Sequence, residues 1–169
     1  LEMIQCFEAI VRNTKIDIPI LLVDDCGEDR RFFEMLDRVS DSLNRNIWII
    51  KQPVNVGFVR GCNSAFGLTG AKDVVLVNSD VQVGPKWLEG LRDAAYSSTL
   101  VATATALSNH ASILSVPFKG IPTSTLHGGL KIDEAAQRVS RASVRSYPSI
   151  PVAIGHCVYI KRTILDLLT

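Results

Sequence analysis

Long hydrophobic runs are absent from the sequence, and so are the glycine motifs of two common nucleotide-binding classes. The apolar stretches span only a few residues, as at 20–23 and 74–77, whereas a helix that crosses a bilayer needs about 20. We therefore expect no membrane span. Neither G-x-G-x-x-G nor G-x-x-x-x-G-K-[ST] occurs, which argues against a dinucleotide-binding Rossmann domain and against a P-loop ATPase.

An excess of one charge and paired cysteines are also lacking. The 18 basic and 17 acidic residues leave a formal charge of +1, without the basic block that contacts to nucleic-acid phosphates require, so we expect no nucleic-acid partner. Cys6, Cys26, Cys62 and Cys157 form no C-x-x-C pair, and neither a zinc site nor a disulfide framework is indicated. No signal peptide is visible, and reduced thiols in the cytoplasm are the expectation.

Helical and extended patterns alternate along the chain. Apolar residues three and four positions apart predict amphipathic helices, and short aliphatic runs predict buried strands. The expected helices are one that carries Met3, Cys6, Phe7, Ile10 and Val11 on its apolar face, one over 32–43, one over 56–68 with Asn55 as N-cap, one with Pro85 near its first turn, one over 131–143, and one from 163. The expected strands are 18–25, 46–52, 73–78, 100–107 and 152–162. This order is typical of an α/β fold with a largely parallel sheet.

The length of the chain fits one domain. With 169 residues, of which 47% are hydrophobic, it is long enough for one core and short for two. Residues 108–151 are irregular and rich in Ser and Pro, as in insertions that are functional or mobile. A helix at the start with no strand before it is unusual for a βαβ architecture, so we expect the first strand of the sheet to be missing from this chain.

Acids follow two of the predicted strands. Asp24 and Asp25 end one strand, and Asn78 and Asp80 follow the aliphatic run 74–77. An unpaired buried carboxylate is strongly unfavourable, so Asp80 should lie where the strand opens to water, a metal or a basic partner. Ligands of open α/β sheets bind outside the carboxyl ends of the strands, so both acids would face one crevice if the strands are close. Ordinary turn formation by Asp and Asn is the alternative.

A loop of sequence NVGFVRGCN lies between these two strands, at residues 55–63. Asn55, Gly57 and Gly61 permit tight backbone, Arg60 supplies a planar cation, and the N-terminus of the following helix could face a phosphate. Glycine near a helix start is common without any ligand. By itself the loop is therefore weak evidence for nucleotide binding.

Taken in order, the segments LLVDD, NVGFVRGCN and VLVNSDV resemble the nucleotide-sugar-binding half of family 2 glycosyltransferases of the GT-A fold, in particular the rhamnosyltransferase-like bacterial branch. GPKWLEGL, ALSNHASILSVP and IPVAIGHCVYIKR are similar to later segments of that family. The resemblance implies a GT-A type nucleotide-diphospho-sugar transferase fold, a mainly parallel sheet flanked by helices. It also implies a single truncated catalytic domain over 1–169, without its first strand and its C-terminal acceptor part. Residues 1–107 would form the nucleotide-sugar-binding half, and 108–169 the insertion and the start of the acceptor-side half.

The resemblance also implies roles for individual residues. Asp25 would hydrogen-bond the nucleobase, and Asp80 would be the metal ligand of a D-x-D-like motif, bridging Mg²⁺ or Mn²⁺ to the sugar diphosphate. Asn78 takes the first position of that motif, where Asp is common, so it would act through its carbonyl or a bound water. The residues expected near the nucleotide or its phosphates are Gly57, Arg60 and Asn63.

The catalytic base is not assigned. In the family it is an acid that follows the segment resembled by GHCVYIKRTILDLLT, so we expect it beyond Thr169, and the chain alone would lack it. Asp166 precedes the expected position. His156, beside Gly155, is either an ordinary residue before a strand or a group near the acceptor pocket.

The activity implied is inverting, metal-dependent transfer of a sugar from a nucleotide-diphosphate donor to a glycan or lipid-linked saccharide acceptor. The expected setting is bacterial surface polysaccharide synthesis, in the cytoplasm or peripherally at the inner face of the membrane, with other glycosyltransferase modules as further partners. Two alternatives stay open. One is a nucleotidyltransferase, which also binds a nucleotide and a metal with acids at strand ends, and the other is a non-catalytic remnant of a glycosyltransferase.

Overall fold

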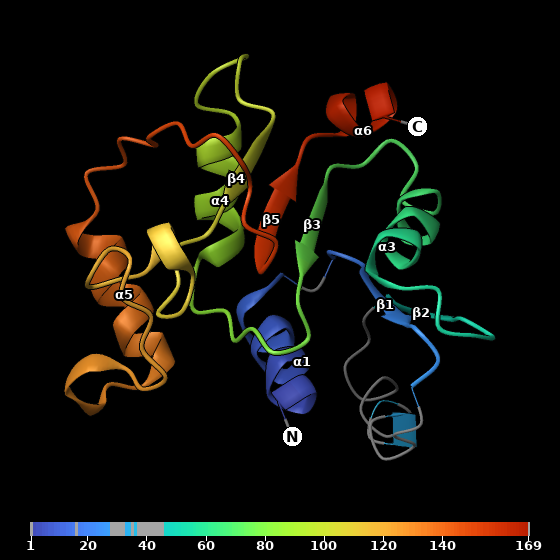
Figure 1. The fold of residues 1–169 in the computed structure, drawn as a ribbon, viewed down its shortest axis with the longest axis horizontal. Coiled ribbons are helices and arrows are strands. Elements are labelled where there is room, and N and C mark those ends of the chain that lie inside the picture. Colours follow the sequence, from blue (N-terminus) through green and yellow to red (C-terminus); the bar gives the residue numbers. More distant parts are fainter. Residues whose placement is uncertain (1, 16, 28–32, 35, 37–45, 169) are drawn as a thin grey trace. The chain divides into compact units, whose positions relative to one another are not determined.

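The computed structural model describes residues 2–15, 17–27, 33, 34, 36 and 46–168 (Figure 1). It contains two compact units, Thr14–Lys72 and a larger one that joins Leu1–Asn13 to Asp73–Thr169. The functional division that the sequence suggests at residue 107 stays a prediction. In the described part of the chain no helix is both long and apolar enough to span a membrane.

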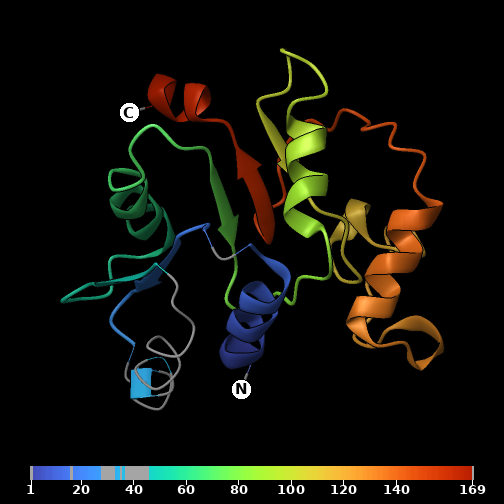
Figure 2. The same ribbon diagram turned by 180° about the vertical axis from the view of Figure 1, so that it is seen from behind.

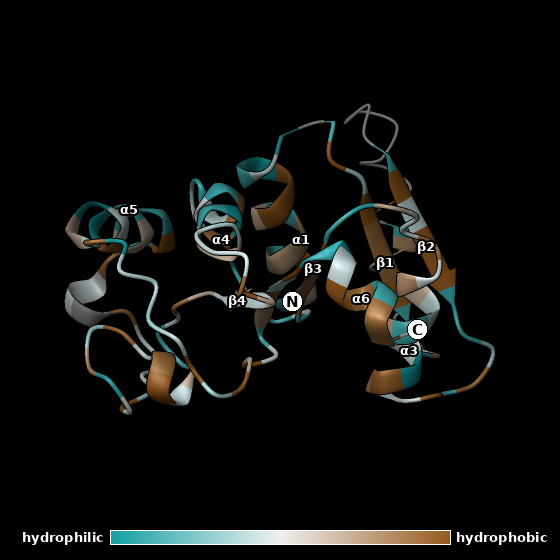
Figure 3. Ribbon diagram, turned by 90° about the horizontal axis from the view of Figure 1, so that it is seen from above, coloured by the Kyte–Doolittle hydropathy of each residue, from teal (hydrophilic) through white to brown (hydrophobic). Residues whose placement is uncertain are grey.

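The smaller unit is built from two strands and a helix. β1 (Ile20–Asp24) and β2 (Ile47–Lys51) pair in parallel along their whole length, and both are largely hydrophobic (Figure 3). α3 (Phe58–Phe66) packs on β1. The buried Gly61 makes this contact, and a Cβ built on it would lie 3.6 Å from Cγ1 of Val23, an ordinary van der Waals distance. The strands predicted over 18–25 and 46–52 are confirmed.

The larger unit contains a three-stranded sheet in the order β3-β5-β4. Its strands are β3 (Val74–Val77), β4 (Thr103–Thr105) and β5 (Cys157–Ile160), and the central β5 is antiparallel to both neighbours. α4 (Trp87–Ala95) packs on β4 and β5, beside which it lies in Figure 2. The buried residues of this core are Leu91, Ala95, Ala104, Cys157 and Tyr159.

The setting of β3 differs from the expectation for residues 74–77. The aliphatic run predicts a strand buried on both faces of a parallel sheet, whereas β3 pairs antiparallel with β5 and all four of its residues are half-buried. An aliphatic run reports burial, not the direction of the neighbouring strand. The direction is set by β5, which enters the sheet after the long irregular segment and therefore could not be read from residues 74–77.

Three more helices belong to the larger unit. These are α1 (Glu2–Asn13), α5 (Ile132–Ala142) and α6 (Arg162–Leu168), and each confirms a predicted helix. α1 buries Cys6 and Phe7, two positions of the apolar stripe by which it was predicted. α6 buries Leu165, whereas α5 has no fully buried residue, so a periodic apolar stripe predicted all three helices although they differ in burial.

The irregular segment from 108 to 151 is anchored through α5. It also contains two short 3₁₀ turns, Ser112–Leu114 and His127–Gly129. A Cβ built on Gly84 would lie 2.3 Å from the Cβ of Ala136 in α5, so the loop after β3 approaches this helix too closely for any side chain. Arg12 of α1 forms an exposed ion pair with Asp133 at 3.7 Å.

Several predicted boundaries shift. The left-handed Lys86 (φ 61°) is the N-cap of α4, so Pro85 directly precedes the cap, near the first turn as predicted. The strand predicted over 100–107 is shortened to β4. The residues that flank it keep only single backbone hydrogen bonds, from the N–H of Ala106 to the Cys157 carbonyl at 3.1 Å and from the N–H of Lys161 to the Ala102 carbonyl at 3.4 Å. The helix predicted over 32–43 lies outside the described residues, except at three helical positions, of which Leu36 is buried.

Candidate functional site

The polar residues after β3 form a turn that main-chain groups hold closed. The N–H of Asn78 donates to the carbonyl of His156 at 3.0 Å, which extends the pairing with β5 by one residue. The Asn78 carbonyl accepts from the N–H of Val81 at 3.2 Å and from the thiol of Cys6 at 3.3 Å. The strand therefore ends because its backbone closes a turn, and Asp80 lies at the exposed corner.

The carboxylate of Asp80 is available to a ligand. It is exposed and forms no hydrogen bond or ion pair with another described residue. The pKa of the Cys6 thiol is raised to about 11, mainly by burial. The hydrogen bond with the Val81 backbone opposes this increase, and the negative charge of Asp80 adds to it. The expectation that this acid opens to solvent is thus met, and the thiol beside it stays protonated at neutral pH.

His156 lies at the same strand end and is half-buried. Among the described residues neither ring nitrogen has a hydrogen-bond partner, and both are shielded from solvent. Burial lowers the pKa of His156, while the backbone of Ala106 and the Asp80 carboxylate act in the opposite direction. The imidazole is therefore neutral at pH 7, a state in which it can donate one hydrogen bond and accept another.

The donor set at this turn fits a hard divalent cation only with help from a ligand. No group of three His, Cys, Asp or Glu side chains among the described residues could hold a metal ion. Mg²⁺ is commonly bound by one or two carboxylates together with substrate phosphates and water. The carboxylate of Asp80 and the amide oxygen of Asn78 are oxygen donors of that kind, so the two residues fit a cation that arrives with a diphosphate.

In the smaller unit, Asp25 holds the loop that leads into α3. Its Oδ1 accepts from the N–H of Val56 at 2.7 Å and its Oδ2 from the N–H of Gly57 at 2.8 Å. The preceding acid, Asp24, is engaged locally, because its Oδ1 accepts from the N–H of Gly27 at 2.7 Å. The acid that ends β1 and the acid that follows it thus differ: Asp24 shapes a short turn, and Asp25 reaches a segment about 30 residues further along the chain.

The start of α3 corrects one prediction. The N-cap is Gly57, with φ 79° and ψ 165°, not Asn55. That φ lies in the region that glycine enters without steric cost, and the cap makes no side-chain hydrogen bond of its own. The Asp25 carboxylate supplies the acceptors instead, and its negative charge next to the helix N-terminus is favourable to the helix dipole.

Arg60 and Asn63 share one face of α3. They are three residues apart in the helix and both are exposed. Neither side chain forms a hydrogen bond or ion pair with another described residue. Because Arg60 lies only two residues after Phe58, where α3 begins, its guanidinium can contact an anion near the N-terminal end of the helix.

The structure thus brings the predicted residues together in two sets. Asn78, Asp80 and His156 meet in the larger unit, and Asp25 lies with the loop and α3 in the smaller one. Asp25 and Asp80 belong to different units, and the expectation that they share one crevice stays a prediction.

A model of the family described as Glycosyl transferase family 2 matches residues 2–168. The chain belongs to this family. A search of curated proteins gave no match. For this glycosyltransferase, the alternation of helices and strands, the parallel β1–β2 pair and the small second sheet are consistent with an α/β GT-A fold. The rhamnosyltransferase-like branch stays a prediction.

Sequence reasoning missed two contacts of the glycosyltransferase that shape its site. Cys6 was predicted only as an apolar position of a helix, although its thiol donates to the Asn78 carbonyl. The hydrogen bond from the Val56 N–H to Asp25 could not be predicted either, because a backbone N–H is present in almost every residue and does not depend on the side chain. The acid that follows β1 and the glycine at position 57 were the visible parts of that arrangement, but their pairing across the fold was not.

Proposed function

We propose that this glycosyltransferase is inverting and metal-dependent, and that it moves a sugar from a nucleotide-diphosphate donor to a glycan or lipid-linked saccharide acceptor. Membership of the family supports glycosyl transfer from a nucleotide sugar. The observation that carries the metal dependence is Asp80, a charged and exposed side chain without a partner in the described chain, at the end of a strand. Bacterial surface polysaccharide synthesis in the cytoplasm is the setting we propose.

Asp80 and Asn78 act together on the diphosphate in this proposal. A bound Mg²⁺ or Mn²⁺ would neutralise the charge that develops on the diphosphate as the glycosidic bond breaks. Asp80 would contribute an anionic ligand and Asn78 a neutral one. The turn keeps both in place through backbone hydrogen bonds, so ligand binding need not break any side-chain contact of Asp80.

Asp25 has two roles in this proposal. It fixes the loop before α3 through the N–H groups of Val56 and Gly57. Each carboxylate oxygen has two lone pairs, so one remains on each for an N–H of the nucleobase. Arg60 and Asn63, on the exposed face of α3, would contact the nucleotide or its phosphates.

His156 is assigned to the acceptor side. Its ring is neutral and lies beside Asn78; because both ring nitrogens are shielded from solvent, a hydrogen bond to a sugar hydroxyl requires the side chain to turn outward. The base remains unassigned, because Asp166 is ion-paired with Arg162 at 2.8 Å and lies in α6.

Calorimetric titration of uridine, thymidine and guanosine diphosphates, with and without Mn²⁺, tests the proposal. Asp80→Ala should weaken the metal-dependent binding by at least about tenfold, as expected for loss of a charged ligand. Asp17→Ala, which removes an exposed acid elsewhere, is the matched control and should bind like the original chain. Equal affinity in Asp80→Ala would refute the metal role. Absence of binding to all three nucleotides would favour the non-catalytic alternative.

A further inference from the structure

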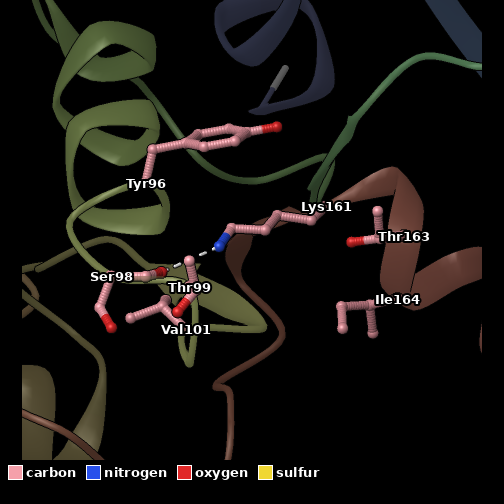
Figure 4. Close-up of a pocket in the computed structure, with 7 residues that line it drawn as sticks. All are labelled: Tyr96, Ser98, Thr99, Val101, Lys161, Thr163 and Ile164. Carbon is pink, nitrogen blue, oxygen red and sulfur yellow. Dashed lines mark hydrogen bonds between the residues drawn. The ribbon is translucent and has the colours of Figure 1, made fainter.

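A pocket lies in the larger unit, at the end of the three-stranded sheet opposite to Asn78 and His156. Lys161 follows β5 at the end where Ile160 pairs with Val74, whereas Asn78 and His156 lie beyond the end where Cys157 pairs with Val77. The cavity measures about 270 Å³. Figure 4 shows Lys161 reaching into it from the strand end.

The pocket contains a buried cation. Lys161 is 8% exposed. Its ammonium donates to the carbonyl of Ser98 at 3.1 Å and lies 4.9 Å from the centroid of the Tyr96 ring, as drawn in Figure 4. An ammonium has three N–H donors, so one hydrogen bond to a neutral carbonyl leaves donors and charge uncompensated.

Among the described residues, no acid supplies the missing charge. The pocket is lined by no carboxylate, and within the described chain no carboxylate forms an ion pair with Lys161. Asp73 is occupied nearby, because it accepts from the hydroxyls of Tyr96 and Tyr159, each at 2.6 Å, and from the N–H of Arg162 at 2.8 Å. A buried charge without a counter-charge is costly, which makes an external anion the natural complement of this site.

The remaining polar groups of the lining suit an oxyanion. Ser98, Thr99 and Thr163 line the pocket with Lys161, and the hydroxyls of the two threonines can donate to an anionic oxygen. The rest of the wall is apolar, with Tyr96 among its members, and an apolar wall strengthens electrostatic attraction by excluding water.

We propose that this pocket binds a small oxyanion of the phosphate class, held by the ammonium of Lys161 and the surrounding hydroxyls. The inference does not depend on the proposed function, because none of its residues belongs to the candidate site. The phosphate could be free in solution or carried by a lipid headgroup. Leu100, which is 93% exposed between the pocket residues Thr99 and Val101, makes the second source worth testing.

Titration of the full chain with inorganic phosphate, followed by ¹H–¹⁵N NMR, tests the site. The amide signals of 98–101 and 161–164 should shift in the original chain. Lys161→Met should weaken this response by at least about tenfold. Lys119→Met, which removes an exposed lysine of the same unit, should leave it unchanged. Absence of shifts at the pocket, or equal shifts in Lys161→Met, would overturn the proposal unless the lipid arm below shows binding that depends on Lys161.

Two further measurements keep the result interpretable. Thr99→Val and Thr163→Val preserve side-chain shape on exposed residues, so they should fold normally and each weaken phosphate binding by about threefold or more.

For the lipid source, vesicles containing phosphatidic acid are compared with pure phosphatidylcholine vesicles by co-sedimentation. Binding to the first alone, lost in Lys161→Met, supports a headgroup phosphate. Failure of both phosphate and phosphatidic acid to bind through Lys161 rejects the site.

Discussion

Replacement of Asp25 by Asn should destabilise the smaller unit, although the change is usually regarded as mild. Both carboxylate oxygens accept backbone N–H groups, from Val56 at 2.7 Å and from Gly57 at 2.8 Å. An Asn side chain offers only one oxygen, so its NH₂ group must face an N–H donor. Asp25→Asn therefore loses one hydrogen bond and creates a donor–donor contact.

The magnitude follows from the kind of bond that is lost. A hydrogen bond to a charged group contributes about 1.5–3 kcal/mol, and the half-buried position of Asp25 favours the lower part of that range. We expect a loss of about 1.5–2 kcal/mol in the free energy of unfolding for Asp25→Asn, and about 2–4 kcal/mol for Asp25→Ala, which removes both acceptors.

Urea denaturation followed by circular dichroism measures these losses. Hydrogen exchange at the amides of Val56 and Gly57 localises them, because both protons should exchange faster in Asp25→Asn. The neighbouring acid is a matched control: Asp24 accepts a single N–H, from Gly27, and the oxygen of Asn can replace it, so Asp24→Asn should be nearly neutral. If Asp25→Asn changes the stability by less than about 0.5 kcal/mol, a typical surface effect, the reasoning is refuted.

The remaining predictions concern two glycines and one acid. Gly84→Ala should lower the free energy of unfolding by about 1–3 kcal/mol, because the added methyl group overpacks against α5. Gly61→Ala should leave it unchanged or raise it by up to about 1 kcal/mol, because the added Cβ has room and Ala favours a helix. Similar denaturation midpoints for the two variants would contradict this. The pKa of Asp73 is lowered: burial alone would raise it, but hydrogen bonds from Tyr159, Tyr96 and the Arg162 backbone outweigh that. Its contribution to stability is therefore present above the unfolded pKa of about 3.9 and is lost as the pH falls through the lower folded value. The melting-temperature difference between the original chain and Asp73→Asn should shrink below about pH 4, and a difference independent of pH would count against this role.

Local patterns predicted the elements well and the contacts between them poorly. The apolar stripe around Cys6 and the aliphatic run before Asn78 identified α1 and β3, because periodicity reports which side chains are buried. The exposure of Asp80 could also be predicted, since a lone carboxylate is too costly to bury. These inferences needed only a few neighbouring residues.

The predictions were wrong where contacts with residues distant in the sequence determine the local structure. Asn55 looked like the N-cap, but Gly57 takes that place and the acceptors come from Asp25, in a different element. Lys161 falls within the strand predicted over 152–162, but β5 ends at Ile160, and the ammonium of Lys161 contacts Tyr96 and Ser98 far away in the sequence. Long-range pairings of this kind leave no local signature.

The carbonyl and N–H of Asn78 hold the turn after β3, whereas the side chains of Asn78 and Asp80 form no hydrogen bond with another described residue. The side chains of Asn78 and Asp80 are therefore not needed to hold the main chain of this turn. Exchanging Asn78 for Asp, or Asp80 for Ser, would alter the affinity for cations while leaving the main chain where it is, so metal preference can be retuned at this corner by substitution alone.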